Sequence, residues 1–241
     1  MVIRSAAVSA LVAALQGEMR QLKTTKRSGR PRNHSGQVPM IGSSSAIRVI
    51  NRLVGAVPLA TREEWEQAIL ELWNNPQHSE ELCAAIGVLW HPRYRHWAGQ
   101  PCSMAVYRKL LLQSPSAECV DAITTRGVSL ALAHHPDTET GLVRSWALAN
   151  NPRLRRAAIR AQHRRRMATD TRLLLNCIVP NLADRNPLVR SAIAPALIDY
   201  GRSGDPARLW VLDTLQELAP RLPHRVIEAV HCRLPAPALN P

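Results

Sequence analysis

Apolar residues recur along most of the chain with the spacing of one helical face. The first stripe lies in residues 2–22 and consists of Val8, Leu11, Val12, Leu15, Met19 and Leu22. Steps of three and four residues are typical of an amphipathic helix. The same pattern predicts further helices at 46–54, 61–73, 80–89, 102–112, 141–149, 155–166, 172–182, 188–200, 206–218 and 225–233. Because the apolar residues are mostly Ala and Leu, with no Phe, the sequence predicts an all-α fold.

Prolines occur at a regular interval along this helical pattern. Pro76, Pro115, Pro152 and Pro187 each precede an apolar helical segment, so that a proline returns roughly every 35 to 40 residues. This period is typical of paired-helix repeats of the HEAT or armadillo kind, which stack into a solenoid. Equivalent helices of a solenoid lie side by side. We therefore expect one concave face to carry Asp121, Arg156 and Arg190, which lie a few residues after their prolines.

The chain divides into four segments by composition. Residues 1–22 form the N-terminal amphipathic helix and residues 23–45 form a loop rich in Lys, Arg, Gly, Ser and Pro. This loop is either a solvated linker or an arm that orders on a phosphate backbone. The repeat array spans 46–233, and 234–241 is a tail. A secretory signal is the competing interpretation of the first helix, but its charged continuation argues against it.

The charge of the chain is strongly positive. There are 31 Lys and Arg residues against 18 Asp and Glu residues, a formal net charge of +13, and arginine dominates the positive side. Arginine pairs with phosphate oxygens in a bidentate way, which favours a nucleic-acid partner on a basic concave face. Two alternatives stay open: a basic protein from a GC-rich genome, and a protein-binding scaffold, the common role of HEAT arrays.

Several other chemistries lack their sequence signatures. The five cysteines are scattered and form no CxxC pair, so neither a disulfide framework nor a zinc site is expected. No Gly-rich phosphate loop, HExxH or Gly-x-Ser-x-Gly motif occurs. No apolar run reaches 18 residues, so no membrane span is expected. We therefore expect a cytoplasmic monomer that uses no metal and no cofactor.

Two local patterns have specific structural interpretations. Thr61 and Glu64 have the spacing of a capping box at a helix start. The stretch WHPRYRHWAGQP places Trp90, Tyr94 and Trp97 among basic residues. These rings either stack on nucleic-acid bases or cover a helix end in the turn between two repeats.

Four segments together resemble the DNA alkylation repair family of AlkD-like glycosylases, which are built from HEAT-like repeats. These segments are NPLVRSAIAPALIDYGR at 186–202, LRRAAIRAQ at 154–162, CVDAI at 119–123 and IGSSSAIRVI at 41–50. In the last segment, Ser45 stands where the family usually has proline. The resemblance covers about residues 41 to 230, and the order and spacing of the segments give it weight.

The resemblance implies a reaction and a set of site residues. Family members remove cationic N3- or N7-alkylated purines from double-stranded DNA by cutting the N-glycosidic bond. The family's catalytic aspartate corresponds to Asp121, and its arginine before an Ala-Ala pair corresponds to Arg156. Two tryptophans usually form an aromatic cleft, but Ala117 and Pro195 stand in their places. Because the family includes self-resistance glycosylases that remove bulky antibiotic adducts, this departure favours a bulky lesion.

Each of these residues also has a simpler interpretation. Asp121 has the position of an ordinary acid near a helix N-terminus. Arg156 and Arg190 lie in a first helical turn, where a cation opposes the helix dipole and calls for an anion. That anion is either a DNA phosphate or a carboxylate such as Asp184 or Glu118. We expect Arg153 and Arg155 to contact DNA as well. The alternative function is a non-catalytic HEAT-like protein that binds DNA or unusual DNA structures.

Overall fold

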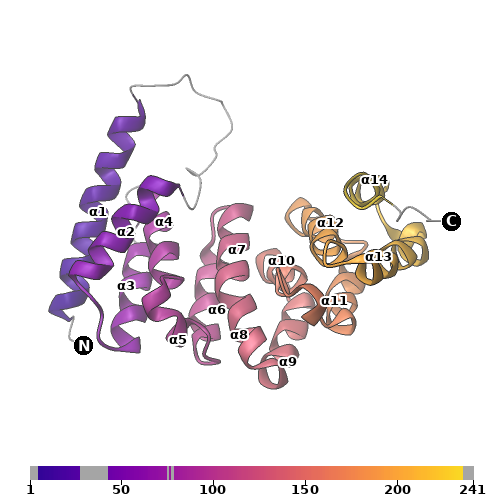
Figure 1. The fold of residues 1–241 in the computed structure, drawn as a ribbon, viewed down its shortest axis with the longest axis horizontal. Helices are drawn as coiled ribbons and strands as arrows, with labels where there is room; N and C mark the ends of the chain where they lie inside the picture. The colour runs from indigo at the N-terminus through magenta and orange to yellow at the C-terminus, as the bar shows by residue number, and fades with distance from the viewer. Residues whose placement is uncertain (1–4, 28–42, 75, 77–78, 236–241) are drawn as a thin grey trace. The chain divides into compact units, whose positions relative to one another are not determined.

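The fold is all-α throughout residues 5–27, 43–74, 76 and 79–235, the part of the chain that the computed structural model describes (Figure 1). Its helices pack as a helical repeat solenoid, as the apolar pattern predicts. The chain forms two compact units, Met1–Ala98 and Gly99–Pro241. Each unit is described by itself.

Unit 1 is built around its first helix. It contains α1 (Ala6–Arg27), α2 (Ser44–Ala56), α3 (Arg62–Asn74), α4 (Ser79–Leu89), η1 (Pro92–Tyr94) and α5 (Arg95–Ala98). Helix α1 packs against α2, α3 and α4, and its predicted stripe from Val8 to Met19 is buried. The helix extends to Arg27, past the predicted boundary at residue 22, because no glycine or proline interrupts residues 23–27. Most of the predicted basic loop, residues 28–42, lies outside the described residues.

Both local patterns in unit 1 have structural roles. The N–H of Glu64 donates to Thr61 Oγ1 at 3.2 Å, and Glu64 Oε2 accepts the N–H of Ala60 at 2.7 Å, which confirms a capping arrangement at the start of α3. The ring of Tyr94 is buried and stacks on Trp97 at a centroid distance of 5.3 Å. Tyr94 Oη also accepts the N–H of Leu59. Tyr94 and Trp97 therefore favour the structural interpretation over base stacking, whereas Trp90 is 41% exposed.

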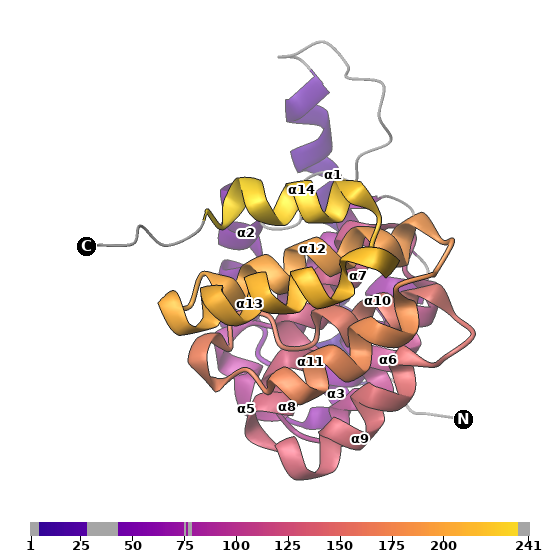
Figure 2. The same cartoon turned by 90° about the vertical axis from the view of Figure 1, so that its right-hand side faces the viewer.

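Unit 2 contains the three repeat helices that follow Pro115, Pro152 and Pro187. Its elements are α6 (Ser103–Gln113), α7 (Ala117–Ile123), η2 (Thr124–Val128), α8 (Ser129–His134), α9 (Pro136–Ala147), α10 (Pro152–Arg160), η3 (Arg166–Ala168), α11 (Thr171–Ile178), η4 (Val179–Asn181), α12 (Pro187–Gly201), α13 (Asp205–Leu218), η5 (Ala219–Arg221) and α14 (His224–Arg233). Helix α10 contacts both α7 and α12, and α12 packs against α13 and α14 (Figure 2). The helices α7, α10 and α12 are therefore consecutive neighbours, as the proline spacing predicts.

A polar side chain caps the start of each of these three helices. Ser116 Oγ accepts the N–H of Cys119 at 3.3 Å, and the amide oxygens of Asn151 and Asn186 each accept an N–H two residues later at 2.9 Å. Pro152 and Pro187 begin α10 and α12, where a missing N–H costs no helical hydrogen bond. The caps fix where α7, α10 and α12 begin, and so fix the places of Asp121, Arg156 and Arg190.

A π-turn interrupts the long helix that carries Asp121. The elements α7, η2 and α8 are continuous, and η2 is a π-helical turn over Thr124–Val128. The hydroxyl of Thr125 donates to the carbonyl oxygen of Asp121 at 2.7 Å. In this turn Gly127 lies against Tyr107, and a Cβ atom at Gly127 would come within 2.8 Å of that buried ring. π-turns often occur at functional sites.

Helix α10 is shorter than the sequence predicts. It ends at Arg160, whereas the pattern predicts a helix to 166. Arg164 and Arg166 have φ values of 59° and 53°, a left-handed conformation that costs about 1–2 kcal/mol in a residue with a Cβ atom. The side-chain amide of Gln162 forms two 2.8 Å hydrogen bonds with the backbone of Asp170 and closes this turn. The prediction was wrong because a local periodicity cannot reveal this long-range closure.

Candidate functional site

Asp121 and Arg156 form a bidentate ion pair between α7 and α10. Arg156 Nε donates to Asp121 Oδ1 at 2.8 Å, and Arg156 Nη2 donates to Asp121 Oδ2 at 2.7 Å. The two residues are 35 positions apart, about one repeat. A parallel pair of N–H···O bonds fixes the plane of the carboxylate as well as its position. The structure therefore brings together the two residues that the family resemblance identifies separately.

The same guanidinium also contacts α12. Arg156 Nη1 donates to the carbonyl oxygen of Leu188 at 2.6 Å and to Ser191 Oγ at 2.8 Å. Only 6% of the Arg156 side chain is exposed, whereas 31% of the Asp121 side chain is exposed. Arg156 is thus a buried support that connects three neighbouring helices. Asp121 is the member of the pair that faces solvent.

The exposed carboxylate keeps part of its hydrogen-bonding capacity. An ionised carboxylate has about four acceptor positions, and Arg156 occupies one on each oxygen. The carboxylate that balances Arg156 is Asp121, in place of the Asp184 or Glu118 considered from the sequence. Hydrogen bonds with Ser116 lower the pKa of Glu118, with a smaller contribution from the Arg156 charge. Because acceptor positions remain on both oxygens of Asp121, this carboxylate can contact a ligand while Arg156 fixes its orientation.

The other predicted DNA-binding arginines differ in their contacts. Arg153 Nε donates to the carbonyl oxygen of Ser114 at 2.6 Å. Arg155 forms an ion pair with Asp184 at 2.8 Å and also donates to two carbonyl oxygens at the end of α9. Both side chains therefore join helices within unit 2. Arg190 is partly exposed, and its side chain has no hydrogen bond or ion pair to the described part of the chain.

The two positions without the expected rings are one helical turn from Asp121 on α7 and one helical turn from Ser191, a contact of Arg156, on α12. Ala117 is the first residue of α7, one turn before Asp121. Pro195 lies inside α12, one turn after Ser191, and has no N–H for the Ser191 carbonyl. Both residues are partly exposed. The positions on α7 and α12 that correspond to the family's two tryptophans therefore carry a methyl group and a pyrrolidine ring.

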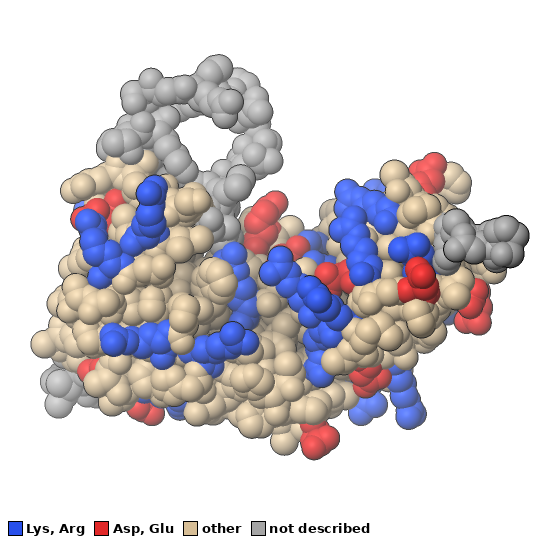
Figure 3. Space-filling view, in the orientation of Figure 1, with Lys and Arg blue, Asp and Glu red and all other residues tan. Residues whose placement is uncertain are grey.

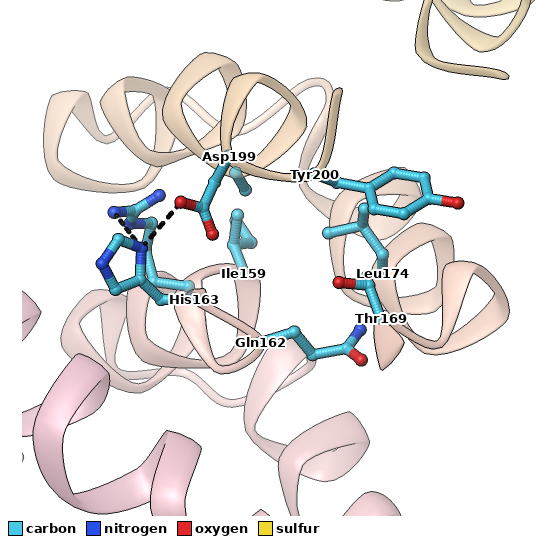
Figure 4. A pocket seen from close by; sticks show the side chains of 9 residues that line it. Ile159, Gln162, His163, Thr169, Leu174, Asp199 and Tyr200 are labelled. Atoms are coloured by element: carbon cyan, nitrogen blue, oxygen red, sulfur yellow. Dashed lines mark hydrogen bonds and ion pairs between the residues drawn. The ribbon is translucent and has the colours of Figure 1, made fainter. Parts of the chain in front are cut away.

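A second polar cluster lies beside α10, and sequence reasoning missed it. Asp199 Oδ1 contacts His163 Nδ1 at 3.2 Å, and Asp199 Oδ2 accepts the N–H of Arg164 at 2.6 Å. Figure 4 shows His163 and Asp199 pointing toward each other on one side of a small pocket that Arg160 also lines. Arg164 and Asp199 are 35 positions apart, as are Asp121 and Arg156. This shared repeat distance is the signal that could have identified the cluster.

Electrostatics link the two clusters through Arg160. Its side chain is buried, and its Nε has no hydrogen-bond partner within the described residues. Burial lowers the pKa of Arg160, while the charges of Asp121 and Asp199 act in the opposite direction. Figure 3 shows that Lys and Arg side chains lie on the surface over α10 and α12, with some Asp and Glu side chains among them. This part of unit 2 is therefore suited to an anionic partner.

Other site chemistries find no support in the described ranges. No group of three or more His, Cys, Asp or Glu residues there could hold a metal ion. The five cysteines are free, and burial raises the pKa of Cys177 to about 12. None of the helices in the described ranges is long and apolar enough to cross a membrane.

The fold and this site define a helical-repeat protein with a buried arginine that orients an exposed aspartate. The family model described as "DNA alkylation repair enzyme" matches residues 15–225 of the chain. The chain therefore belongs to this family, and DNA is its expected class of partner. A comparison with curated proteins gave no match.

Proposed function

We propose that this protein is a DNA glycosylase that removes cationic N3- or N7-alkylated purines from double-stranded DNA. The observation that carries the proposal is the Asp121–Arg156 pair, in which a buried guanidinium orients a partly exposed carboxylate. Membership of a DNA alkylation repair family supports alkylated DNA as the substrate. We propose that the protein acts as a monomer; both residues of the pair come from one chain, so the site needs no second copy.

The chemistry of the lesion explains why one carboxylate suffices. An N3- or N7-alkylpurine already carries a positive charge, so the departing base needs no proton from a general acid, unlike an ordinary glycoside. The remaining task is to stabilise the cationic sugar and to direct a water molecule to it. A preorganised opposite charge usually contributes more to such catalysis than any other single effect. Asp121 supplies this charge, and Arg156 is its positioning residue.

The size of the lesion follows from the residues around Asp121. Ala117 and Pro195 offer little surface to hold a methylated base, since they lack the rings that would make cation–π contacts. The same substitutions leave space for a larger group. We therefore propose a bulky adduct on N3 or N7 as the preferred substrate. Arg190, with no side-chain partner in the described part of the chain, is the first candidate for a phosphate contact.

The direct test is a base-release assay. Duplex DNA carrying either an N7-methyl or a bulky N3- or N7-alkyl purine is incubated with the protein, and the released base is measured. Release of the bulky adduct, with uracil in a matched duplex left in place, supports the proposal. Failure to release either cationic lesion contradicts it.

The second candidate function is DNA binding without base excision. It is favoured by one specific observation: Arg156 already pairs with Asp121 and so offsets part of the charge that catalysis would use. In that case the protein would bind duplex or unusual DNA structures through its arginines. Tight, salt-sensitive binding without any base release would identify this function.

A further inference from the structure

The turn after α10 has an unusual backbone. Arg164 and Arg166 are both in the left-handed region, and no other non-glycine residue of the described chain has a positive φ. Glycine adopts this conformation without a steric penalty. Two arginines therefore occupy positions at which glycine would fit better. We call residues Arg164 to Met167 the arginine turn.

Contacts within unit 2 hold the arginine turn in place. The N–H of Arg164 donates to Asp199 at 2.6 Å, and Gln162 closes the base of the turn on Asp170. Arg165 Nη1 donates to the carbonyl oxygen of Leu132 at 3.1 Å. Figure 4 shows Gln162, His163 and Asp199 around the pocket at its base. Strain that the surroundings enforce is typical of binding and catalytic segments.

Three side chains of the turn are exposed and available to a binding partner. Arg164 and Arg166 are exposed, and neither side chain has a hydrogen bond or ion pair to the described residues. Met167, beside them, is 58% exposed, one of the few large apolar side chains on the described surface. Contacts within the protein therefore explain the backbone conformation of the turn. They do not explain why its exposed side chains are Arg164, Arg166 and Met167.

The turn lies close to the candidate site along α10. Arg156 and Arg160 are one helical turn apart on α10, and Arg164 lies in the turn that follows the end of this helix. Arg160, between them, is affected by both Asp121 and Asp199, and Asp199 is the residue that holds the turn. Because the charges of Asp121 and Asp199 both act on Arg160, the candidate site and the arginine turn are neighbours that one duplex can contact together.

We propose that the arginine turn is a DNA-contacting wedge. Arg164 and Arg166 bind backbone phosphates, and Met167 inserts its apolar side chain between base pairs near the candidate site. Apolar side chains that unstack a base step, beside arginines that bind the backbone, are a known way to deform duplex DNA. This inference rests on DNA as the partner, but it does not require base excision.

Glycine substitutions separate binding from folding. Arg164→Gly and Arg166→Gly remove a side chain and relieve the backbone at once. Each variant is expected to keep or raise its melting temperature, yet to bind an undamaged duplex at least about threefold more weakly, with a salt slope smaller by about one. Arg164→Lys, which keeps the charge, should retain most of the affinity. Glycine variants that bind as well as the parent would overturn the proposal.

Met167→Ala tests insertion. A duplex with 2-aminopurine at successive positions should become more fluorescent at one base step when the parent binds, because unstacking relieves quenching. Met167→Ala should lose this signal, whereas Leu209→Ala, which removes an exposed apolar side chain from α13, should keep it. An unchanged signal in Met167→Ala would refute the wedge. Because the DNA is undamaged, the outcome does not depend on glycosylase activity.

Discussion

Arg155 and Arg156 are neighbours on α10, yet each pairs with a different carboxylate. Arg155 Nε contacts Asp184 at 2.8 Å, and Arg156 Nη2 contacts Asp121 at 2.7 Å. The two ion pairs are chemically alike, and both of their arginines lie on α10. Only the Asp121 pair includes a residue that the proposed reaction uses. The chain therefore contains its own control for the effect of losing an Arg–Asp pair.

Asp121→Asn should abolish base release with little effect on DNA affinity. The loss of one preorganised charge is expected to reduce excision by a factor on the order of 10² or more. Asp121→Asn and Asp184→Asn should each reduce the free energy of unfolding by about 1–3 kcal/mol, as expected for a partly buried pair. Asp184→Asn should nevertheless leave excision intact. The measurements are single-turnover base release and chemical denaturation. Asp121→Asn that excises like the parent would exclude the glycosylase mechanism.

DNA affinity should depend steeply on salt. If about six phosphates are neutralised, the logarithm of the affinity falls with the logarithm of salt concentration at a slope near −5. Arg190→Ala should reduce this slope by about one and weaken binding equally on all sequences. Arg172→Ala, which removes an exposed arginine from α11, is the matched control. Affinity that does not respond to salt would favour a protein-binding scaffold.

Ala117→Trp should reverse the lesion preference. An indole ring one turn before Asp121 would give a methylated purine a surface to contact and would fill space that a bulky adduct needs. We expect faster release of N7-methylguanine and slower release of the bulky adduct, measured side by side on matched duplexes. Ala122→Trp, at the residue following Asp121, controls for the presence of a tryptophan on α7. Equal changes for both lesions would contradict the proposed cleft.

Asp199 should make folding stability sensitive to acid. Burial alone would raise the pKa of Asp199, but hydrogen bonds from His163 and the Arg164 N–H outweigh it and hold the pKa below its usual range. The contribution of the Asp199 carboxylate to the free energy of unfolding is therefore complete above about pH 4. This contribution is lost as pH falls through the lowered pKa. Urea denaturation at several pH values should show a smaller loss on acidification for Asp199→Asn. Asp213→Asn, at an exposed position on α13, should behave like the parent.

The sequence was sufficient to predict features that depend on local periodicity. Apolar spacing located most helices, and proline spacing predicted that α7, α10 and α12 are neighbours. The repeat distance predicted that Asp121 and Arg156 share a face, but the ion pair between them was not predicted, because Asp184 and Glu118 were the carboxylates considered for Arg156. These features could be predicted because a repeat places equivalent positions side by side.

Features that depend on contacts across repeats could not be predicted in this way. The end of α10 at Arg160 depends on Gln162 bonding to Asp170, and the left-handed arginines depend on Asp199. The roles of Arg153 and Arg155 at neighbouring helix ends likewise became visible only with the backbone in place. Arginine forms long, multivalent contacts, so its composition alone does not distinguish a DNA contact from an internal one.

The π-turn at Thr124–Val128 sets the rotational phase of the helix segment that carries Asp121. Successive residues of an α-helix are rotated by about 100°, so one inserted or deleted residue within this turn would rotate α7 against α8 by about that angle. Helix α8 can keep its packing on α9 while α7 presents a different set of side chains. Insertion or deletion of a single residue in this turn could therefore change the lesion specificity of related proteins while the packing of the neighbouring helices is kept.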